Sequence, residues 1–357
     1  MAYVVWFDEF RQDLRDQVGG KNASLGELTA AGLPVPPGFA LVAGACRSVL
    51  DGVQSEIAGI LAAADLDQPA SVGSASGRIR ALIESAPVPD EVLDAVAAAY
   101  QRLCERCATK DIPVAVRSSA TCEDSPDASF AGEHDTYLWI RGVDEVLTHV
   151  RRCWSSLFTD RALCYRRAMG LTNAAMAMSV GVQKMVTPRS AGVAFTLNPL
   201  DGDRSQVAID ASWGFGEAVV SGEVTPDNFL VDKVLGEVSR RTVSNKEIEY
   251  RLGADDRVER AAVPADRASA PSLTDEQIKA VAALARRAEK HYRCPQDVEW
   301  AVDDTLPEPD NVLLLQSRPE TVWSRKARTP VSPAGDYLTS IVNTLSAPLA
   351  AKADHHH

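Results

Sequence analysis

The chain has 357 residues, of which 45% are hydrophobic and 24% are charged, and 37 Lys and Arg against 49 Asp and Glu give a net charge of −12. This length predicts two or three subdomains, and the composition is ordinary for a soluble globular protein. The negative charge argues against nucleic acid as a general partner, so an anionic ligand needs a local cationic pocket.

The N-terminus and the cysteines indicate a cytoplasmic protein with reduced thiols. MAYVVWFDEF lacks the basic start and long apolar run of a signal peptide, and no run approaches the roughly 18 apolar residues of a membrane span. The seven cysteines are scattered, and their one CxxC pair, Cys104 and Cys107, lies in an amphipathic helical pattern. A metal or redox site is therefore not expected there. The closing residues 355–357 are interpreted as the remnant of a purification tag.

The first half of the chain alternates between strand and helix patterns without a strict βαβ rhythm. YVVWF predicts a short strand, and a glycine pair opens the helical stretch GGKNASLGELTAAG. The three prolines of LPVPPGFALV predict an extended connection. Helices are then expected at about 43–65, 75–86, 89–109 and across 144–170, and strands at 112–117 and 135–140.

From about residue 175 the pattern is mostly that of strands. MAMSVGVQKMV, SAGVAFTLN, SQVAIDASW and NFLVDKV each predict one, and a hairpin turn is expected at Leu235–Gly236. The polar segment 251–273 is expected as a surface excursion. The helix TDEQIKAVAALARRAEKHY then precedes two final strands, QDVEWAVD and NVLLLQSRP. After Val322 the composition is that of a linker, and residues 337–345 place apolar side chains on one face of a short helix.

Two cations stand where an anion could be bound. Arg117 ends the apolar strand VAVR and is followed by a loop rich in Ser, Asp, Ala and Gly. The planar fork of arginine suits phosphate and small residues let the backbone approach it, although a solvated loop with a surface arginine gives the same pattern. Lys21 follows a glycine pair at a predicted helix start, where the helix dipole favours an anion, but alone it would be a surface lysine. VGGKNAS is not a P-loop, because Arg15 and Asn22 replace its first glycine and its Ser/Thr.

Two polar pairs continue the last two apolar strands. Asp297 and Glu299 share one strand face, because side chains alternate with period two, and Gln316 and Arg318 share a face of the next strand. Such groups are costly to bury without partners. A carboxylate and an amide oxygen on neighbouring strands make good ligands for Mg²⁺, with Arg318 balancing phosphate charge. The alternative is a buried Glu–Arg ion pair with a purely structural role.

A longer set of segments carries a family resemblance. The segments are, in chain order, GGKNASLGEL, VPPGFALV, VAVRSSATCEDSPDASFAGEHDTYL, SLFTDRALCYR, GVQKMV, AGVAFTLNP, DASWGFGEAVVSGEVTPD, DVEW and LLLQSRP. Together, over about residues 5–323, they resemble the ATP-binding domain of the phosphoenolpyruvate synthase and pyruvate phosphate dikinase family. Rifampicin phosphotransferase and phenylphosphate synthase belong to the same group, and EHDTYL and DASWGFGEAVVSG look closest to the rifampicin and phosphoenolpyruvate synthase branch.

The resemblance implies an α+β fold of the ATP-grasp type, in which two lobes close on a nucleotide. The expected organisation is an N-terminal lobe at 1–185, a C-terminal lobe at 186–323, a linker and short amphipathic tail at 324–354, and the tag remnant at 355–357.

The resemblance also implies ATP and Mg²⁺ as ligands. Lys21, Arg117 and Arg318 would bind phosphates and act in catalysis, and Gly132 and Thr136 would flank a phosphate-covering loop at 125–136. Gln183, with Met185 and Val186 of the hinge, would face the adenine, Glu217 resembles the ribose-side carboxylate, and Glu299 and Gln316 resemble the metal ligands.

In this family a histidine on a separate swivelling domain attacks the β-phosphorus of ATP. AMP leaves, the γ-phosphate is released as Pi, and the phosphohistidine phosphorylates an organic acceptor at a second site. The sequence has no Thr-Ser-His-like segment of that domain, and His134, His149 and His291 are interpreted as surface or packing residues. The resemblance therefore implies the ATP-binding component of a dikinase-type phosphotransferase. Its expected partners are a phosphohistidine domain or subunit and an acceptor-binding one, without nucleic acid or membrane.

Several alternatives stay open. The chain could be a separate subunit, as in phenylphosphate synthase, or a domain cut from a rifampicin phosphotransferase or phosphoenolpyruvate synthase; the stretch GDYLTSIVNTLSAPLAAKAD slightly favours the subunit. A catalytically silent nucleotide-sensing module is a further alternative, against which the intact set of phosphate and metal residues argues. An ATP-grasp carboxylate ligase would instead form ADP and an acyl phosphate. The sequence does not identify the phosphate acceptor.

Overall fold

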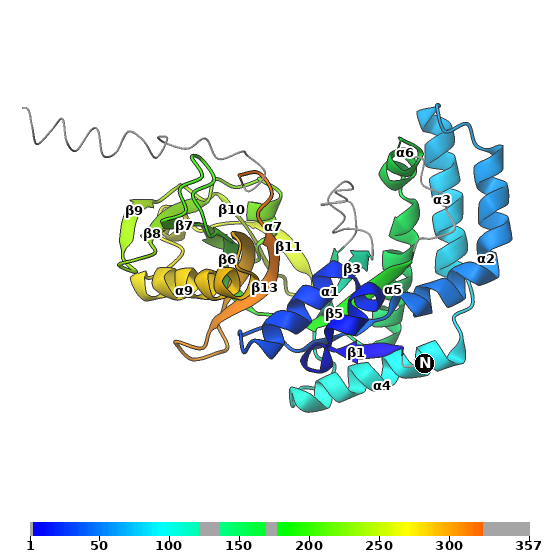
Figure 1. Cartoon of the computed structure of the whole chain (residues 1–357), viewed down its shortest axis with the longest axis horizontal. Helices are drawn as coiled ribbons and strands as arrows, with labels where there is room; N and C mark the ends of the chain where they lie inside the picture. Colours follow the sequence, from blue (N-terminus) through cyan, green and yellow to red (C-terminus); the bar gives the residue numbers. More distant parts are fainter. Residues whose placement is uncertain (1–2, 121–135, 169–176, 324–357) are drawn as a thin grey trace, which may run out of the picture. The chain divides into compact units, whose positions relative to one another are not determined.

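The computed structural model describes residues 3–120, 136–168 and 177–323 (Figure 1). Residues Met1–Glu320 form one compact unit, and Thr321–His357 form a second, which is described only at 321–323. Among the described helices, none has both the length and the apolar character that crossing a membrane requires.

The first sheet is antiparallel throughout and has the strand order β1-β2-β5-β3-β4. Its strands are β1 (Val4–Trp6), β2 (Gly38–Leu41), β3 (Val114–Ala120), β4 (Thr136–Ile140) and β5 (Met178–Lys184). Alternation along β3 and β5 sorts the side chains onto two faces. Val116 and Val182 join the larger hydrophobic core, whereas Arg117 and Gln183, one position along, lie on the opposite face.

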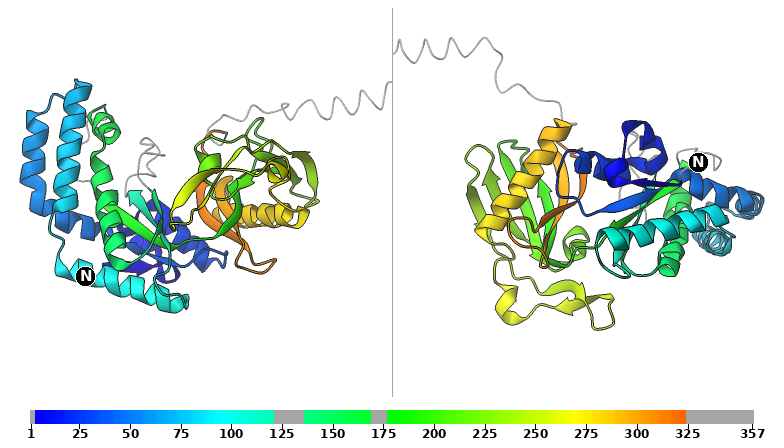
Figure 2. Two further views of the ribbon diagram at one scale, coloured as in Figure 1. Left: turned by 180° about the vertical axis from the view of Figure 1, so that it is seen from behind. Right: turned by 90° about the horizontal axis from the view of Figure 1, so that it is seen from below.

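Helices cover both faces of this sheet. The large core lies under α2 (Ala43–Ala63), α3 (Pro69–Ser85), α4 (Asp90–Arg106) and α5 (Val143–Ser155), and α6 (Asp160–Ala168) runs beside α3 (Figures 1 and 2). Helix α1 (Arg15–Ala30) packs on the opposite face, so closely that a Cβ added at Gly181 would lie 2.3 Å from Asn22 Oδ1. Three short 3₁₀ helices, Phe7–Glu9, Gln12–Leu14 and Ser156–Phe158, complete this part.

The second sheet is also antiparallel and has the order β13-β12-β6-β7-β8-β9. Its strands are β6 (Pro188–Phe195), β7 (Gln206–Trp213), β8 (Asp227–Asp232), β9 (Val238–Thr242), β12 (Gln296–Asp303) and β13 (Val312–Pro319). Helix α9 (Asp275–Tyr292) covers one face with an apolar stripe, and a capping box of Thr274 and Gln277 starts it. Val298 and Trp300 of β12 are buried in this core.

A two-stranded ribbon leaves the second sheet between β9 and α9. Its strands β10 (Ile248–Leu252) and β11 (Val258–Ala262) pair antiparallel, short helix α8 (Ala265–Ala268) follows, and the ribbon stands apart from the sheet in Figure 2. A buried ion pair fixes its base: Lys246 Nζ lies 2.6 Å from Asp227 Oδ1, and both side chains are fully buried. The other oxygen of Asp227 accepts hydrogen bonds from Ser272 N and Oγ at 2.8 and 2.7 Å.

The two sheets with their helices are of the α+β class that the sequence predicts, so that part of the prediction is confirmed, and the ATP-grasp type stays what the family resemblance implies. The hairpin expected at Leu235–Gly236 is also confirmed, between β8 and β9. The strands of the first sheet lie within residues 4–184 and those of the second within 188–319, which supports a lobe boundary at 185 and 186; the boundary itself stays a prediction. The tail helix expected at 337–345 lies outside the described residues.

Two local expectations need correction. Arg117 does not end its strand, because Ser118, Ser119 and Ala120 continue the ladder with β5. The proline-rich connection ends in a true strand, β2, paired on both sides. The surface excursion expected from residue 251 agrees with the structure over 251–262, where it belongs to the ribbon and contains no buried residue.

Candidate functional site

Arg117 joins the two sheets. Its guanidinium donates from Nη1 to the Leu315 carbonyl at 3.1 Å, and from Nη2 to Glu299 Oε2 at 3.2 Å and to Gln316 Oε1 at 3.4 Å. The arginine side chain is only 20% exposed, so most of its hydrogen-bonding capacity is met by protein. These contacts link β3 to the last two strands of the second sheet.

Glu299 and Gln316 are direct partners across β12 and β13, where a bulge follows Glu299. Because Val298 and Trp300 point into the core under α9, Glu299 faces away from that helix. The carboxylate and the amide oxygen therefore converge on one point, which a cationic nitrogen occupies. Two hard oxygens held this way fit a divalent cation such as Mg²⁺.

A metal at this position would need further ligands. Within the described residues, no group of three or more His, Cys, Asp or Glu side chains is arranged to hold a metal ion. Mg²⁺ commonly uses one or two carboxylates and completes its shell with water and substrate phosphates. The two protein oxygens therefore suit a site that is completed by a nucleotide.

Asp297 and Arg318 form a second pair on the same two strands. They are direct cross-strand partners, and Arg318 Nε lies 3.5 Å from Asp297 Oδ2. Arg318 is 58% exposed, whereas Asp297 is 20% exposed and its Oδ1 has no hydrogen-bond partner among the described residues. Burial raises the pKa of Asp297 to about 6, although Arg318 acts in the opposite direction. Sequence reasoning placed Asp297 beside Glu299 but did not select it; the period-two spacing was the signal available.

Lys21 lies beside Arg117, at a break in α1. Gly19 has φ 71° and ψ 166°, so the helix that starts at Arg15 restarts after the glycine. Lys21 Nζ donates to the Ser118 carbonyl at 3.4 Å. Asn22 fixes this turn on the sheet, because its backbone N–H donates to Ser119 Oγ and its amide donates to Ser179 Oγ. The lysine is thus next to β3 and stands at a helix start, as the glycine pair predicts, with one further helical turn before the break at Gly19.

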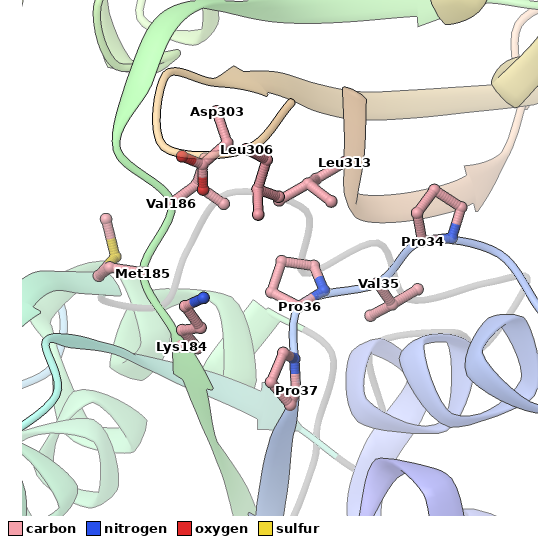
Figure 3. Close-up of a pocket in the computed structure, with 10 residues that line it drawn as sticks. All are labelled: Pro34, Val35, Pro36, Pro37, Lys184, Met185, Val186, Asp303, Leu306 and Leu313. Carbon is pink, nitrogen blue, oxygen red and sulfur yellow. The ribbon is translucent and has the colours of Figure 1, made fainter. Parts of the chain in front are cut away.

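The segment after β5 lines a pocket. The pocket, of about 120 Å³, is lined by Pro34, Val35, Pro36, Pro37, Lys184, Met185, Val186, Asp303, Leu306 and Leu313 (Figure 3). Figure 3 shows Val186, Leu306 and Leu313 on one side and the prolines on the other, with the Met185 side chain turned away from the prolines. Met185 packs instead against Trp139 and Phe215. Gln183 does not line the pocket; it is buried and donates to the Pro36 carbonyl at 3.2 Å.

Glu217 and Thr136 lie on other elements. Glu217 starts the short helix α7 (Glu217–Val220), and the turn before it is held by the ribbon, since Phe215 N donates to the Tyr250 carbonyl at 2.8 Å. Gly214 is required in this turn, because its φ is 70° and a Cβ would lie 2.1 Å from that carbonyl. Thr136 is exposed and pairs with Arg117 across β3 and β4.

The structure thus brings Arg117, Glu299 and Gln316 into direct contact. Lys21 of α1 contacts β3 next to Arg117, and Arg318 lies two positions after Gln316 on β13. It shows no hydrogen bond or ion pair between Glu217 and the phosphate or metal candidates among the described residues. Gly132, with the rest of the expected phosphate-covering loop before Thr136, lies outside the described residues.

Comparisons with known proteins bear on this arrangement. A family model described as "Pyruvate phosphate dikinase, AMP/ATP-binding domain" matches residues 15–335. The phosphoenolpyruvate synthase of Aeropyrum pernix is 40% identical over 350 residues, which cover 90% of this chain and 43% of that protein. The rifampicin phosphotransferase of a Streptomyces species is 42% identical over 308 residues, covering 85% of this chain and 34% of that protein.

Among solved structures, the D-alanyl-alanine synthetase A of Vibrio cholerae matches 94% of this chain and 65% of its own, with a TM-score of 0.35 and 11% identity. A similarity this low carries no argument. The chain spans less than half the length of the two relatives.

Proposed function

The chain belongs to the pyruvate phosphate dikinase AMP/ATP-binding domain family, and from this membership we propose that it binds Mg-ATP and supplies the pyrophosphoryl group to a histidine on another domain or subunit. The relatives are named as a phosphoenolpyruvate synthase and a rifampicin phosphotransferase. A cytoplasmic location is part of the same proposal.

One observation carries the proposal: a guanidinium from the first sheet meets a carboxylate–amide pair from the second. A purely structural ion pair would need only Glu299, whereas Gln316 adds a neutral oxygen at the same point. Arginine suits phosphate oxygens, and the oxygens of a carboxylate and an amide are hard ligands that suit Mg²⁺ when phosphate oxygens and water complete its shell. The set therefore contains partners for both halves of Mg-ATP.

The chain's residues would act by positioning and by charge. Lys21, Arg117 and Arg318 would hold phosphate oxygens and stabilise charge that develops during transfer. Glu299 and Gln316 would hold Mg²⁺, which when bound neutralises part of the roughly fourfold negative charge of the triphosphate. We further propose that Gln183, Met185 and Val186 lie on the adenine side, Glu217 on the ribose side, and Gly132 and Thr136 beside the phosphates.

The nucleophile is proposed to come from elsewhere. Attack of a histidine on the β-phosphorus would break the bond to the α,β-bridging oxygen, release AMP and leave a pyrophosphorylated histidine. Water would then cleave the bond between the β- and γ-phosphates, giving the phosphohistidine and Pi. His149 is engaged in packing: its Nδ1 contacts the Glu145 carbonyl at 2.8 Å and its ring lies 4.7 Å from that of Tyr137. His134 lies outside the described residues.

Calorimetry tests the first step. Titration of ATP with Mg²⁺ into the full chain should give saturable binding with little turnover, because the histidine domain is supplied separately. If millimolar ATP gives no binding heat, and adding AMP does not change the titration, ATP binding is refuted. A silent sensing module would bind ATP but give no AMP when a histidine-bearing partner is added, so AMP formation separates the two candidates.

A further inference from the structure

The oxygens proposed as metal ligands already have a cation between them. Arg117 Nη2 donates to Glu299 Oε2 at 3.2 Å and to Gln316 Oε1 at 3.4 Å, so one nitrogen occupies the point on which both oxygens converge. Nη1 of the same group donates to the Leu315 carbonyl at 3.1 Å, which fixes the guanidinium in this position.

A metal ion and this nitrogen exclude each other. Mg²⁺ sits about 2.1 Å from its ligand oxygens. A Mg²⁺ bound to both oxygens on the side from which Arg117 reaches them would lie closer to Nη2 than two cations can approach, and the two charges repel strongly in a half-buried site. The guanidinium has to leave before the metal can bind both oxygens.

We propose that Arg117 takes the place of the metal in the nucleotide-free protein, and that Mg²⁺ enters only as the triphosphate gives Arg117 a new partner. The inference rests on the proposed function and adds the order in which its ligands are accepted. Without nucleotide, Arg117 and Glu299 neutralise each other, and a divalent cation would leave an excess of positive charge. A bound triphosphate supplies negative charge for both cations, so the arginine can move to phosphate and release the two oxygens.

The consequence is a coupling between metal and nucleotide. A metal ion without nucleotide competes with Arg117 for the two oxygens and therefore binds weakly. A metal ion that arrives with nucleotide meets no such competition, because Arg117 has moved to the phosphates. By linkage, each ligand strengthens the binding of the other by the same factor. The arrangement would also limit capture of free divalent ions by an otherwise open pair of oxygens.

Mn²⁺ binding in the absence of nucleotide tests the competition. Free Mn²⁺ can be measured by electron paramagnetic resonance while the full chain is titrated with the metal. The test variant is Arg117→Met, which keeps the bulk of the side chain and removes its charge. The matched control is Arg106→Met, since Arg106 also pairs with a carboxylate, Asp8, at 3.0 Å but lies on α4.

Arg117→Met should bind Mn²⁺ about tenfold more tightly than the wild type, because a charge-assisted competitor has been removed. Arg106→Met should not differ from the wild type. Adding Glu299→Gln to Arg117→Met should abolish the gain, which shows that the metal uses the released carboxylate. If Arg117→Met fails to fold, Arg117→Gln serves the same purpose.

The competition is refuted if Arg117→Met binds Mn²⁺ no more tightly than the wild type, or if the gain survives the loss of Glu299. Either result is distinct from a failure of the proposed function, because the metal titration contains no nucleotide. If the wild-type chain shows no ATP binding, the proposed function is overturned. The metal titration still shows whether Arg117 and the metal compete for the two oxygens.

Discussion

Replacing Asp297 by Asn should stabilise the protein at neutral pH and have little effect in acid. The side chain is 20% exposed and its Oδ1 has no hydrogen-bond partner among the described residues. Its ion-pair partner Arg318 is 58% exposed, with Nε 3.5 Å from Asp297 Oδ2. Burial therefore raises the pKa of this carboxyl from 3.8 to about 6. An ionised Asp297 is a cost to the folded state, which the neutral amide avoids.

The pH dependence of the unfolding free energy follows from the raised pKa of Asp297. Below the unfolded value of 3.8, Asp297 is protonated in both states and costs nothing. Between the two values the unfolded chain releases the proton while the buried carboxyl keeps it, so the unfolding free energy falls as pH rises, and the full cost is reached once pH has passed the folded value of about 6. A difference of about two pKa units corresponds to at most about 3 kcal/mol of unfolding free energy at neutral pH, and the opposing effect of Arg318 is already contained in the raised pKa.

Denaturant unfolding at pH 4.5 and 7.5 measures this. Asp297→Asn should raise the unfolding free energy at pH 7.5 by about 1–3 kcal/mol and change it much less at pH 4.5. Asp67→Asn is the matched control of opposite sign, because a hydrogen bond from Arg167 lowers the pKa of that exposed carboxyl. A destabilised Asp297→Asn variant at pH 7.5 would show that Arg318 holds Asp297 in its charged form and would refute the burial argument.

Three further predictions concern the site and its support. Arg117→Met should weaken Mg-ATP binding by about tenfold or more, from loss of charge-assisted contacts, while its melting temperature stays near that of Arg106→Met; a lower melting temperature with intact affinity would favour a purely structural ion pair. Lys246→Met should lower the unfolding free energy by about 3–5 kcal/mol, because it leaves Asp227 charged and buried, and an unchanged denaturation midpoint would contradict that. With a histidine-bearing partner, β-labelled ATP should leave label on the partner and γ-labelled ATP should release labelled Pi, whereas formation of ADP would indicate a kinase or ligase reaction.

The sequence predicted the strands of the site well because their patterns are local. In QDVEWAVD and NVLLLQSRP, apolar side chains at every second position fix which residues share a face. Glu299 and Gln316 were therefore expected on neighbouring strands, and the structure pairs them directly. The long helix α9 was equally predictable from the sequence, because its apolar stripe and its Thr274 cap lie within one segment.

The contacts between distant segments were not predictable in the same way. Arg117 and Glu299 are separated by 182 positions, and no local pattern says which carboxylate an arginine will meet. The continuation of β3 past Arg117 depends on its pairing with β5, which comes about 60 residues later. The burial of Asp297, and with it the raised pKa, depends on what packs over its strand face rather than on its neighbours in the chain.

The pairing of each arginine in the site explains how a protein of net charge −12 can keep cations ready for an anion. Arg117 of β3 pairs with Glu299 of β12, and Arg318 of β13 pairs with Asp297, two positions before Glu299 on β12. Each pair is locally neutral, so neither arginine adds to a strong uncompensated field in the empty site. When a triphosphate binds, its oxygens would replace the carboxylates as partners of the two arginines. Glu299 would then become available to a metal. Each broken ion pair costs free energy, and a new contact with phosphate or metal offsets that cost. The site is therefore selective for a ligand that brings both anionic oxygens and a divalent cation.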